Sequence, residues 1–136
     1  MDHFDIIVIG GDAAGMSAAS QARRTNPGLS LAVFEKGAHV SYAACGMPYY
    51  ISGEISNHRS LLAIDKEDFI HKRNINIFSE TEIVSVDLEQ KNVTAKCEGS
   101  PCRYSYDSLI IATGARAVVP PIPGINSKNV FFLRSL

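Results

Sequence analysis

The amino-acid sequence predicts an α/β fold: a Rossmann-like parallel sheet that carries an inserted antiparallel β-meander. Residues 5–24 contain an apolar strand, a glycine-rich turn and a helix, and a second apolar strand ends at Glu35. This is the strand-helix-strand order of a dinucleotide-binding unit. Short alternating segments over residues 74–106 predict the meander, and an apolar run over residues 106–114 predicts a return to the parallel sheet.

Composition limits the chain to about one domain and favours a small-molecule partner. The 136 residues, 46% of them hydrophobic, provide for one ordinary core. Thirteen basic and fourteen acidic residues give a net charge of -1, so charge gives no reason to expect a nucleic acid or an anionic membrane as partner. No apolar run approaches the ~20 residues of a membrane span, and no basic region of a signal peptide precedes the first apolar run. We therefore expect a cytoplasmic protein.

The first strand leads through glycines into a helix. Ile6-Ile7-Val8-Ile9 is a run of β-favouring residues, as in a parallel strand that is covered on both faces. The helix extends to about residue 24, where Pro27-Gly28 stops it. Small residues recur at a spacing that places them on one helical face, where we expect close packing on the sheet: Ala14, Ala18 and Ala22.

The turn between strand and helix is suited to a pyrophosphate. Gly10 and Gly15 let the backbone approach the phosphates, whose charge free N–H groups and the positive end of the helix would meet. Glu35, twenty residues beyond Gly15, is placed to accept hydrogen bonds from a ribose and disfavours a 2'-phosphate. Asp12 replaces the middle glycine of the G-x-G-x-x-G pattern, so its carboxylate has to point away from the phosphates. The alternative is a tight turn that binds no ligand.

The three cysteines receive different interpretations. Cys45 lies among small and aromatic residues in the stretch 41–50, just before a segment that could start a helix, and it is the candidate reactive thiol. Cys97 and Cys102 flank a predicted turn at residues 98–101. An odd number of cysteines in a cytoplasmic protein does not make a disulfide framework, so we expect these two to be ordinary strand-end residues. The four histidines are scattered without ligand spacing, and we expect no metal site.

The middle of the chain predicts one helix and then the meander. Residues 60–73 indicate a loop and an amphipathic helix, with Asp65 as its candidate N-cap and Phe69 on its buried side. Tyr104 and Tyr106 share one side of the last meander strand and are interpreted as packing residues. Strand-like segments of the meander cover residues 74–78, 82–88, 92–97 and 103–106.

The last part of the chain predicts a return strand and a stiff exit. The strand over residues 106–114 ends in Ala112-Thr113-Gly114, and Gly114 lets the chain pass close to a neighbour or a ligand. A plain strand-to-loop exit is the alternative. Prolines over residues 120–124 disfavour a helix or a central strand. Val130-Phe131-Phe132-Leu133 is apolar and strand-like, and we expect the domain to be truncated.

In combination these motifs resemble the N-terminal FAD half of the flavin-dependent pyridine nucleotide-disulfide oxidoreductases, and most of all their single-cysteine branch. That branch holds coenzyme A-disulfide reductases, persulfide and polysulfide reductases, and NADH oxidases and peroxidases. The resemblance covers essentially the whole chain. It implies that residues 1–136 are an FAD-binding domain from which the nicotinamide-binding and dimerisation domains of the family are absent, and that the full-length protein is a homodimer. The motifs that carry the resemblance are the glycine turn with Glu35, the stretch Ser41-Tyr42-x-x-Cys45-Gly46-x-Pro48-Tyr49, and Tyr106-Asp107 through Ala112-Thr113-Gly114 to Pro123-Gly124.

The resemblance implies FAD as the bound dinucleotide and NAD(P)H as the electron donor of the full-length enzyme. Because this branch often lacks the middle glycine, it accommodates Asp12. Glu35 would hold the adenosine ribose with Lys36 beside it, and the backbone of Ile83 would meet the adenine. The remaining residues that it assigns to FAD are Gly10, Gly11, Ala14 and Gly15 at the pyrophosphate, and Ala112, Thr113 and Gly114 where the chain would close over the cofactor.

The resemblance also implies that Cys45 is a single redox-active cysteine. Classical family members use a C-x-x-x-x-C pair, and Tyr50 takes the second position here. Oxidised Cys45 must therefore pair with a group from outside its segment. The implied activity is reduction of a disulfide, persulfide or polysulfide such as coenzyme A disulfide. The alternatives are an NADH oxidase or peroxidase that cycles Cys45 through sulfenic acid, and a fragment that binds FAD without catalysis.

Coenzyme A remains open as a substrate or ligand. The arginines Arg23 and Arg24 could meet its phosphates. Ala44 replaces an asparagine that contacts the substrate in the coenzyme A-disulfide reductases. An exposed helix end without a ligand is the alternative interpretation of this part of the first helix. The residues that match the substrate-binding positions of those reductases are Ser17, Gln21, Arg24 and Ser41.

Overall fold

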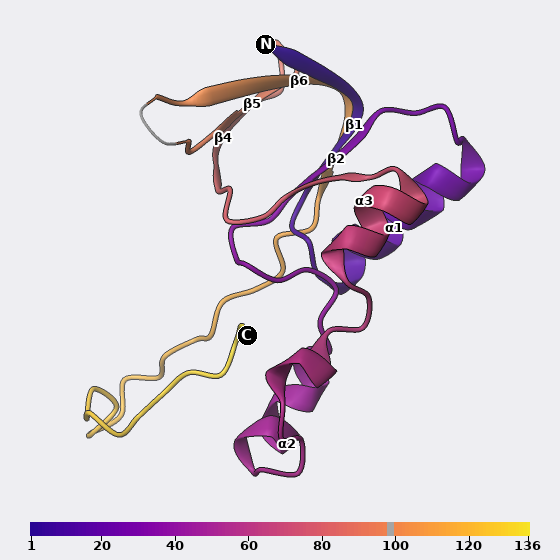
Figure 1. Ribbon diagram of the computed structural model, residues 1–136. Helices are drawn as coiled ribbons and strands as arrows, with labels where there is room; N and C mark the ends of the chain where they lie inside the picture. Colours follow the sequence, from indigo (N-terminus) through magenta and orange to yellow (C-terminus); the bar gives the residue numbers. More distant parts are fainter. Residues whose placement is uncertain (98–99) are drawn as a thin grey trace.

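The computed structural model describes residues 1–97 and 100–136, and it has the α/β architecture that the sequence predicts (Figure 1). The described strands form one mixed sheet in the order β3-β2-β1-β6-β5-β4. Among the described residues, no helix is both long and apolar enough to cross a membrane. The elements are β1 (Asp2–Ile9), α1 (Ala13–Thr25), β2 (Leu31–Phe34), the 3-10 turn η1 (Ala44–Gly46), α2 (Met47–Ile51), the 3-10 turn η2 (His58–Leu61), α3 (Lys66–Arg73), β3 (Asn76–Phe78), β4 (Ile83–Asp87), β5 (Asn92–Ala95) and β6 (Cys102–Ile111).

The centre of the parallel half of the sheet is buried on both faces, as the unbroken apolar runs of β1 and β2 predict. β1 pairs in parallel with β2 and with β6, and β2 pairs in parallel with β3. All four residues of β2 are buried, and Ile7 and Val8 of β1 have no exposed surface. Figure 1 shows α1 and α3 side by side on one face of this half. Phe69 of α3 is buried in the core of that face together with Val8 and Leu31, as predicted.

The helix α1 turns a different face to the sheet from the one that its alanines predict. Its buried residues are Gly15, Met16, Ala19 and Ser20, whereas Ala14 is exposed and Ala18 and Ala22 are only partly buried. The reason is the close approach at Gly15, where an added Cβ would meet the carbonyl oxygen of Gly10 and lie 3.2 Å from Val8 Cγ1. This contact fixes the rotation of the helix about its axis, so that Met16, Ala19 and Ser20 face the core.

The antiparallel half differs from the predicted meander in two respects. β6 is one strand of 10 residues, so the segments predicted as 103–106 and 106–114 are joined: it pairs in parallel with β1 and antiparallel with β5. β3 is not part of the meander, because it pairs in parallel with β2. Asn74 adopts a left-handed conformation at the end of α3, which turns the chain towards β2, and Asn76 then donates from Nδ2 to the carbonyl of Leu31 at 2.9 Å.

A second core lies on the face opposite the helices. Val93 and Ala95 of β5 are fully buried there, and Tyr106 is 5% exposed. Phe34 stacks on Phe78 with ring centroids 4.7 Å apart, and Tyr104 packs 4.9 Å from Phe34. The two tyrosines of β6 are therefore packing residues, as predicted.

Cys97 and Cys102 form a disulfide, so their interpretation as ordinary strand-end residues is wrong. The antiparallel register places Ala95 opposite Cys102, and this brings the two cysteines to the mouth of the β5–β6 hairpin with their Cα atoms 5.9 Å apart. That separation lies in the usual range for a disulfide. Residues 98 and 99 of the predicted turn lie outside the described residues.

The C-terminal segment contains no strand, so the strand predicted at 130–133 is wrong. After β6 the chain leaves the sheet, extends away from it and turns back (Figure 1). Phe131 is 85% exposed. On the way back Arg134 donates from Nε to the carbonyl of Ala115 at 2.6 Å. No strand forms because these apolar residues lie beside no strand with which they could pair.

Candidate functional site

The glycine turn is built from close backbone contacts that leave no space for side chains. Gly10 has φ of 107°, and a Cβ there would collide with the carbonyl oxygen of Ala112. A Cβ on Gly15 would collide with the carbonyl oxygen of Gly10. Ala112 donates its N–H to the carbonyl of Ile9 at 2.8 Å. The structure therefore brings Ala112, where the return begins, against the start of the glycine turn.

The first turn of α1 retains free hydrogen-bond donors. Asp12 is the N-cap residue, but its side chain makes no capping hydrogen bond. Met16 donates to the carbonyl of Asp12 at 2.9 Å, whereas the N–H groups of the exposed residues Ala13 and Ala14 have no partner among the described residues. Unpaired N–H groups at the positive end of a helix bind anions. The turn thus fits a pyrophosphate.

Glu35 is held at the end of β2 by two backbone donors. The N–H of Gly11 donates to Oε2 at 2.7 Å, and the N–H of Gly37 donates to Oε1 at 2.7 Å. Because each carboxylate oxygen can accept more than one hydrogen bond, Glu35 can still accept bonds from ribose hydroxyls. The contact with Gly11 ties the carboxylate directly to the glycine turn.

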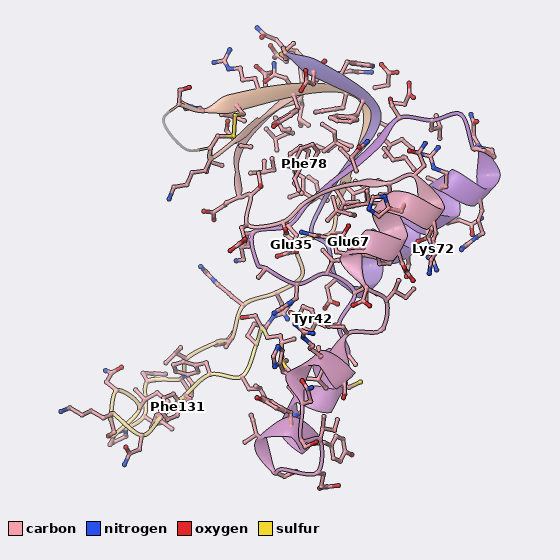
Figure 2. The ribbon with its side chains drawn as sticks, in the orientation of Figure 1. Glu35, Tyr42, Glu67, Lys72, Phe78 and Phe131 are labelled. Carbon is pink, nitrogen blue, oxygen red and sulfur yellow. A yellow bond between two sulfur atoms is a disulfide. The ribbon has the colours of Figure 1, made fainter. Side chains whose placement is uncertain are left out.

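A cavity of about 650 Å³ opens beside Glu35. Lys36 lines it, and Ile83 lies at the start of β4 next to Glu82, which also lines it. Figure 2 shows Glu35 and Tyr42 between the sheet and α2. Other lining residues are Gly37, His39, Tyr42, Glu80, Lys96, Cys97, Ser135 and Leu136. The volume and the mixed charge suit part of a dinucleotide.

Cys45 lies on an exposed turn that is anchored on either side. It is a free, exposed cysteine in η1, directly before α2. Ser41 donates its N–H to the carbonyl of Gly11 at 2.9 Å, which joins the cysteine stretch to the glycine turn. Met47 is 5% exposed, and a Cβ on Gly46 would lie 2.6 Å from Leu61 Cδ2. The thiol is therefore open to solvent on a turn whose neighbours are packed.

The predicted substrate residues of α1 form a separate exposed group. Arg24 donates from Nη2 to Gln21 Oε1 at 2.7 Å, and Ser17 is exposed on the same helix. Arg23 does not share this role, because its guanidinium donates to the carbonyls of Pro27, Arg73 and Asn74 and so joins the ends of α1 and α3. In the part of the chain that the structure describes, no hydrogen bond links these α1 side chains to Ser41 or Cys45.

Tyr42 and Arg134 belong to the site although no role was predicted for them. Burial raises the pKa of the Tyr42 phenol above its usual value, the Asp12 carboxylate raises it further, and Arg134 opposes this effect. Arg134 also reaches Gly114, where an added Cβ would lie 2.5 Å from Nη2. The Ser41-Tyr42 motif was a signal for Tyr42. No signal existed for Arg134, because its position depends on the fold-back of the C-terminal segment.

A group of possible metal ligands lies at the start of β1. Ligand atoms of His3, Asp5 and Asp107 lie within 4.8 Å of one another. Asp5 Oδ2 already accepts from the N–H of Ser30 at 2.6 Å and from its Oγ at 2.8 Å. These bonds hold the pKa of the Asp5 carboxyl below its usual value. Exposed groups of this kind are common without an ion, and we assign no metal to them.

Comparisons with known proteins identify the family of the chain. The family model described as pyridine nucleotide-disulphide oxidoreductase matches residues 4–136. A protein of Pyrococcus horikoshii named NAD(P)H coenzyme A polysulfide/persulfide reductase is 40% identical over 126 residues, which are 93% of this chain and 28% of that protein. A protein of Methanocaldococcus jannaschii named NADH oxidase is 36% identical over 133 residues, which are 96% of this chain and 29% of that protein.

A solved structure gives the same result for the fold. The structure titled as an NAD-dependent persulfide reductase from A. fulgidus superimposes with a TM-score of 0.89 at 40% identity, over 96% of this chain and 24% of that one. The chain thus spans less than a third of the length of each of these relatives.

Proposed function

The chain belongs to the pyridine nucleotide-disulphide oxidoreductase family, and on that premise we propose that it is the FAD-binding part of an NAD(P)H-dependent enzyme that reduces a disulfide, persulfide or polysulfide through Cys45. One observation carries the proposal: a free, exposed cysteine lies in a stretch that a Ser41 to Gly11 hydrogen bond joins to a glycine turn whose first helical N–H groups are free in the described part of the chain. We further propose that the protein is cytoplasmic and that its full-length form adds a nicotinamide-binding and a dimerisation domain and assembles as a homodimer.

The residues present fit FAD. The turn Gly10, Gly11, Ala14 and Gly15 would bind the pyrophosphate with backbone N–H groups, because the glycines leave room for close approach. Glu35 and Lys36 would bind the adenosine ribose, and the backbone of Ile83 the adenine. Ala112, Thr113 and Gly114 would close the site from the neighbouring strand. When bound, FAD takes a hydride from NAD(P)H and passes two electrons on to sulfur.

Cys45 would act as the nucleophile. Its thiolate attacks one sulfur of a substrate RS–SR', so a Cys45–SR bond forms, the S–S bond of the substrate breaks and R'S⁻ leaves. Two electrons that originate from NAD(P)H then break the Cys45–SR bond and release RS⁻ and the Cys45 thiolate. Tyr50 occupies the place of a second cysteine, so the chain's own stretch supplies no thiol that could resolve the mixed disulfide.

Coenzyme A disulfide or coenzyme A persulfide is the substrate that we favour. The Pyrococcus horikoshii relative carries coenzyme A, polysulfide and persulfide in its name. Gln21 and Arg24 are exposed and bonded to each other on α1, where the guanidinium can bind phosphate. Ser17 and Ser41 would complete the contacts. Ala44 offers no polar group, which leaves a persulfide or polysulfide without coenzyme A as the alternative.

The second candidate is an NADH oxidase or peroxidase. The Methanocaldococcus jannaschii relative bears the name NADH oxidase. An exposed cysteine without a resolving partner can also be oxidised to sulfenic acid and reduced again. In this case the electrons from NADH reduce oxygen or a peroxide in place of a disulfide.

Three measurements test these proposals. The purified chain should bind FAD and turn yellow, and mass spectrometry of untreated protein should find a coenzyme A adduct on Cys45 that a thiol reductant removes. A sulfenate that reacts with dimedone would support the second candidate. A chain that binds FAD and shows neither modification, and leaves NADH unoxidised, would be an FAD-binding fragment without catalysis. A colourless chain that does not bind added FAD would contradict the proposed cofactor.

A further inference from the structure

Asp12 is the unusual residue of the site, because one oxygen of its side chain has no hydrogen-bond partner in the described part of the chain. Its Oδ1 is the buried side-chain atom that has no hydrogen-bond partner among the described residues. A buried carboxylate oxygen without a donor loses its hydration and gains nothing in return, so such atoms are rare in folded proteins. The residue occupies the position in the glycine turn where the common pattern has glycine.

Local structure does not explain the side chain. An aspartate at an N-cap usually accepts a hydrogen bond from the second or third N–H of the helix, and Asp12 does not. Beyond the effect of burial, Asp12 lies close enough to Tyr42 to raise the pKa of its phenol, an effect to which Glu35 adds and which Arg134 opposes, and none of these three groups donates a hydrogen bond to Asp12 Oδ1. Glu35 is itself occupied by Gly11 and Gly37. The described part of the fold thus leaves Oδ1 of Asp12 without a partner.

We propose that the Asp12 carboxylate accepts a hydrogen bond from a hydroxyl group of the bound dinucleotide next to its pyrophosphate. This inference rests on the proposed function and adds a contact to it. The chemistry of the pair selects a hydroxyl: a carboxylate only accepts, and phosphate oxygens also only accept, so the pyrophosphate cannot be the partner. The donors that flank it in FAD are hydroxyls of the adenosine ribose and of the ribityl chain.

Asp12 then selects the ligand as well as binding it. A carboxylate close to a pyrophosphate repels it, and only a ligand that brings a hydroxyl to Oδ1 offsets this repulsion. The N–H groups of Ala13 and Ala14 remain free for the phosphates because Asp12 does not use them for capping. The two functions of the turn are therefore divided: the backbone binds the anion and the side chain binds the polyol.

The test compares Asp12→Ala, Asp12→Asn and the control Asp65→Ala. Asp65 is also an N-cap aspartate without a side-chain cap bond, at the start of α3, and it is exposed. Fluorescence titration gives the dissociation constants for FAD and ADP, and thermal unfolding is measured without ligand. We expect Asp12→Ala to weaken FAD binding about 10- to 100-fold, the range of a hydrogen bond to a charged group, and to raise the unfolding temperature of the ligand-free chain. Asp12→Asn keeps an acceptor oxygen and should bind FAD within about 10-fold of the wild type.

The outcomes distinguish the two possible hydroxyls and show which proposal fails. Weaker FAD binding with unchanged ADP binding supports a ribityl hydroxyl, because ADP lacks that chain. Weakening of both ligands supports the ribose hydroxyl. Equal or tighter binding of FAD by Asp12→Ala, or an effect of equal size in Asp65→Ala, overturns the inference and leaves the proposed cofactor intact. A wild-type chain that binds neither FAD nor ADP overturns the proposed function, and the inference with it.

Discussion

The glycine turn and the cysteine stretch are neighbours in space and differ in how firmly they are built. Around the turn, backbone atoms from β1, α1 and the end of β6 are in contact, and Glu35 is bonded from two sides. Cys45 by contrast lies on a short 3-10 turn before a helix of 5 residues, with Tyr49 and Ile51 more than half exposed. A site that holds a cofactor has to be rigid, whereas a thiol that meets substrates from solution has to remain open.

Among the tests of this contrast, Gly15→Ala should have the largest effect. The new Cβ would meet the carbonyl oxygen of Gly10, and a backbone atom cannot move aside, so we expect a loss of about 3 kcal/mol in the free energy of unfolding together with loss of FAD binding. Urea denaturation and FAD titration measure both. Gly28→Ala is the matched control, because its nearest neighbour would be 3.4 Å away. Equal stability of the two variants would contradict the rigid turn.

The same contrast explains which features of the structure can be predicted from the sequence. That Gly10 and Gly15 serve close backbone approach and that Glu35 ends β2 could be predicted, because these features belong to a local sequence pattern. The atoms that they meet, such as the carbonyl of Ala112 beside Gly10, could not be predicted, because they come from elsewhere in the fold. The Cys97–Cys102 disulfide could not, since it depends on the register of β5 against β6. Short-range patterns do not contain strand register.

Other differences between prediction and structure also arise from contacts between distant parts of the chain. The 74–78 segment alternates like a meander strand, yet tertiary contacts place it parallel to β2. Arg23 looks like a phosphate ligand in sequence, but three carbonyls occupy its guanidinium. The unbonded carboxylate of Asp12 was equally hidden, because the sequence shows only that a glycine is missing.

The disulfide at the edge of the cavity gives the next prediction. Cys97 lines the cavity and closes a short loop with Cys102. Reduction, or the double change Cys97→Ser with Cys102→Ser, should lower the free energy of unfolding by about 2 kcal/mol, the loop-closure value for so short a loop. Urea denaturation with and without reductant measures it. The double variant should no longer respond to reductant, and an unchanged midpoint in the wild type would show that the disulfide adds nothing to this half of the site.

Cys45→Ser tests the cysteine stretch, the exposed half of the contrast. The side chain is exposed and bonded to nothing that the fold requires, so the free energy of unfolding should change by no more than about 0.5 kcal/mol. The same change should remove every thiol-reversible adduct or dimedone product from the protein. Mass spectrometry and urea denaturation together test the separation of chemistry from stability. Adducts that persist in the variant would show that another residue is the reactive group, and a large loss of stability would show that Cys45 contributes to the core.

The smallest effect that we expect belongs to Asp5, which braces β1 against the residue before β2. The backbone N–H and the hydroxyl of Ser30 bind its carboxylate and lower its pKa in the folded state. A lowered folded pKa means that the stabilisation is complete above the ordinary pKa and is lost as the pH falls through the folded value. The stability difference between wild type and Asp5→Asn should therefore be largest near neutral pH and shrink on acidification below about pH 4. Thermal unfolding over this range measures it, and Ser30→Ala, which removes one of the two donors, should reduce the pH dependence of the difference. A difference that stays constant down to acid pH would mean that these bonds do not distinguish the charged carboxylate, and the firmness of this part of the sheet would then rest on packing alone.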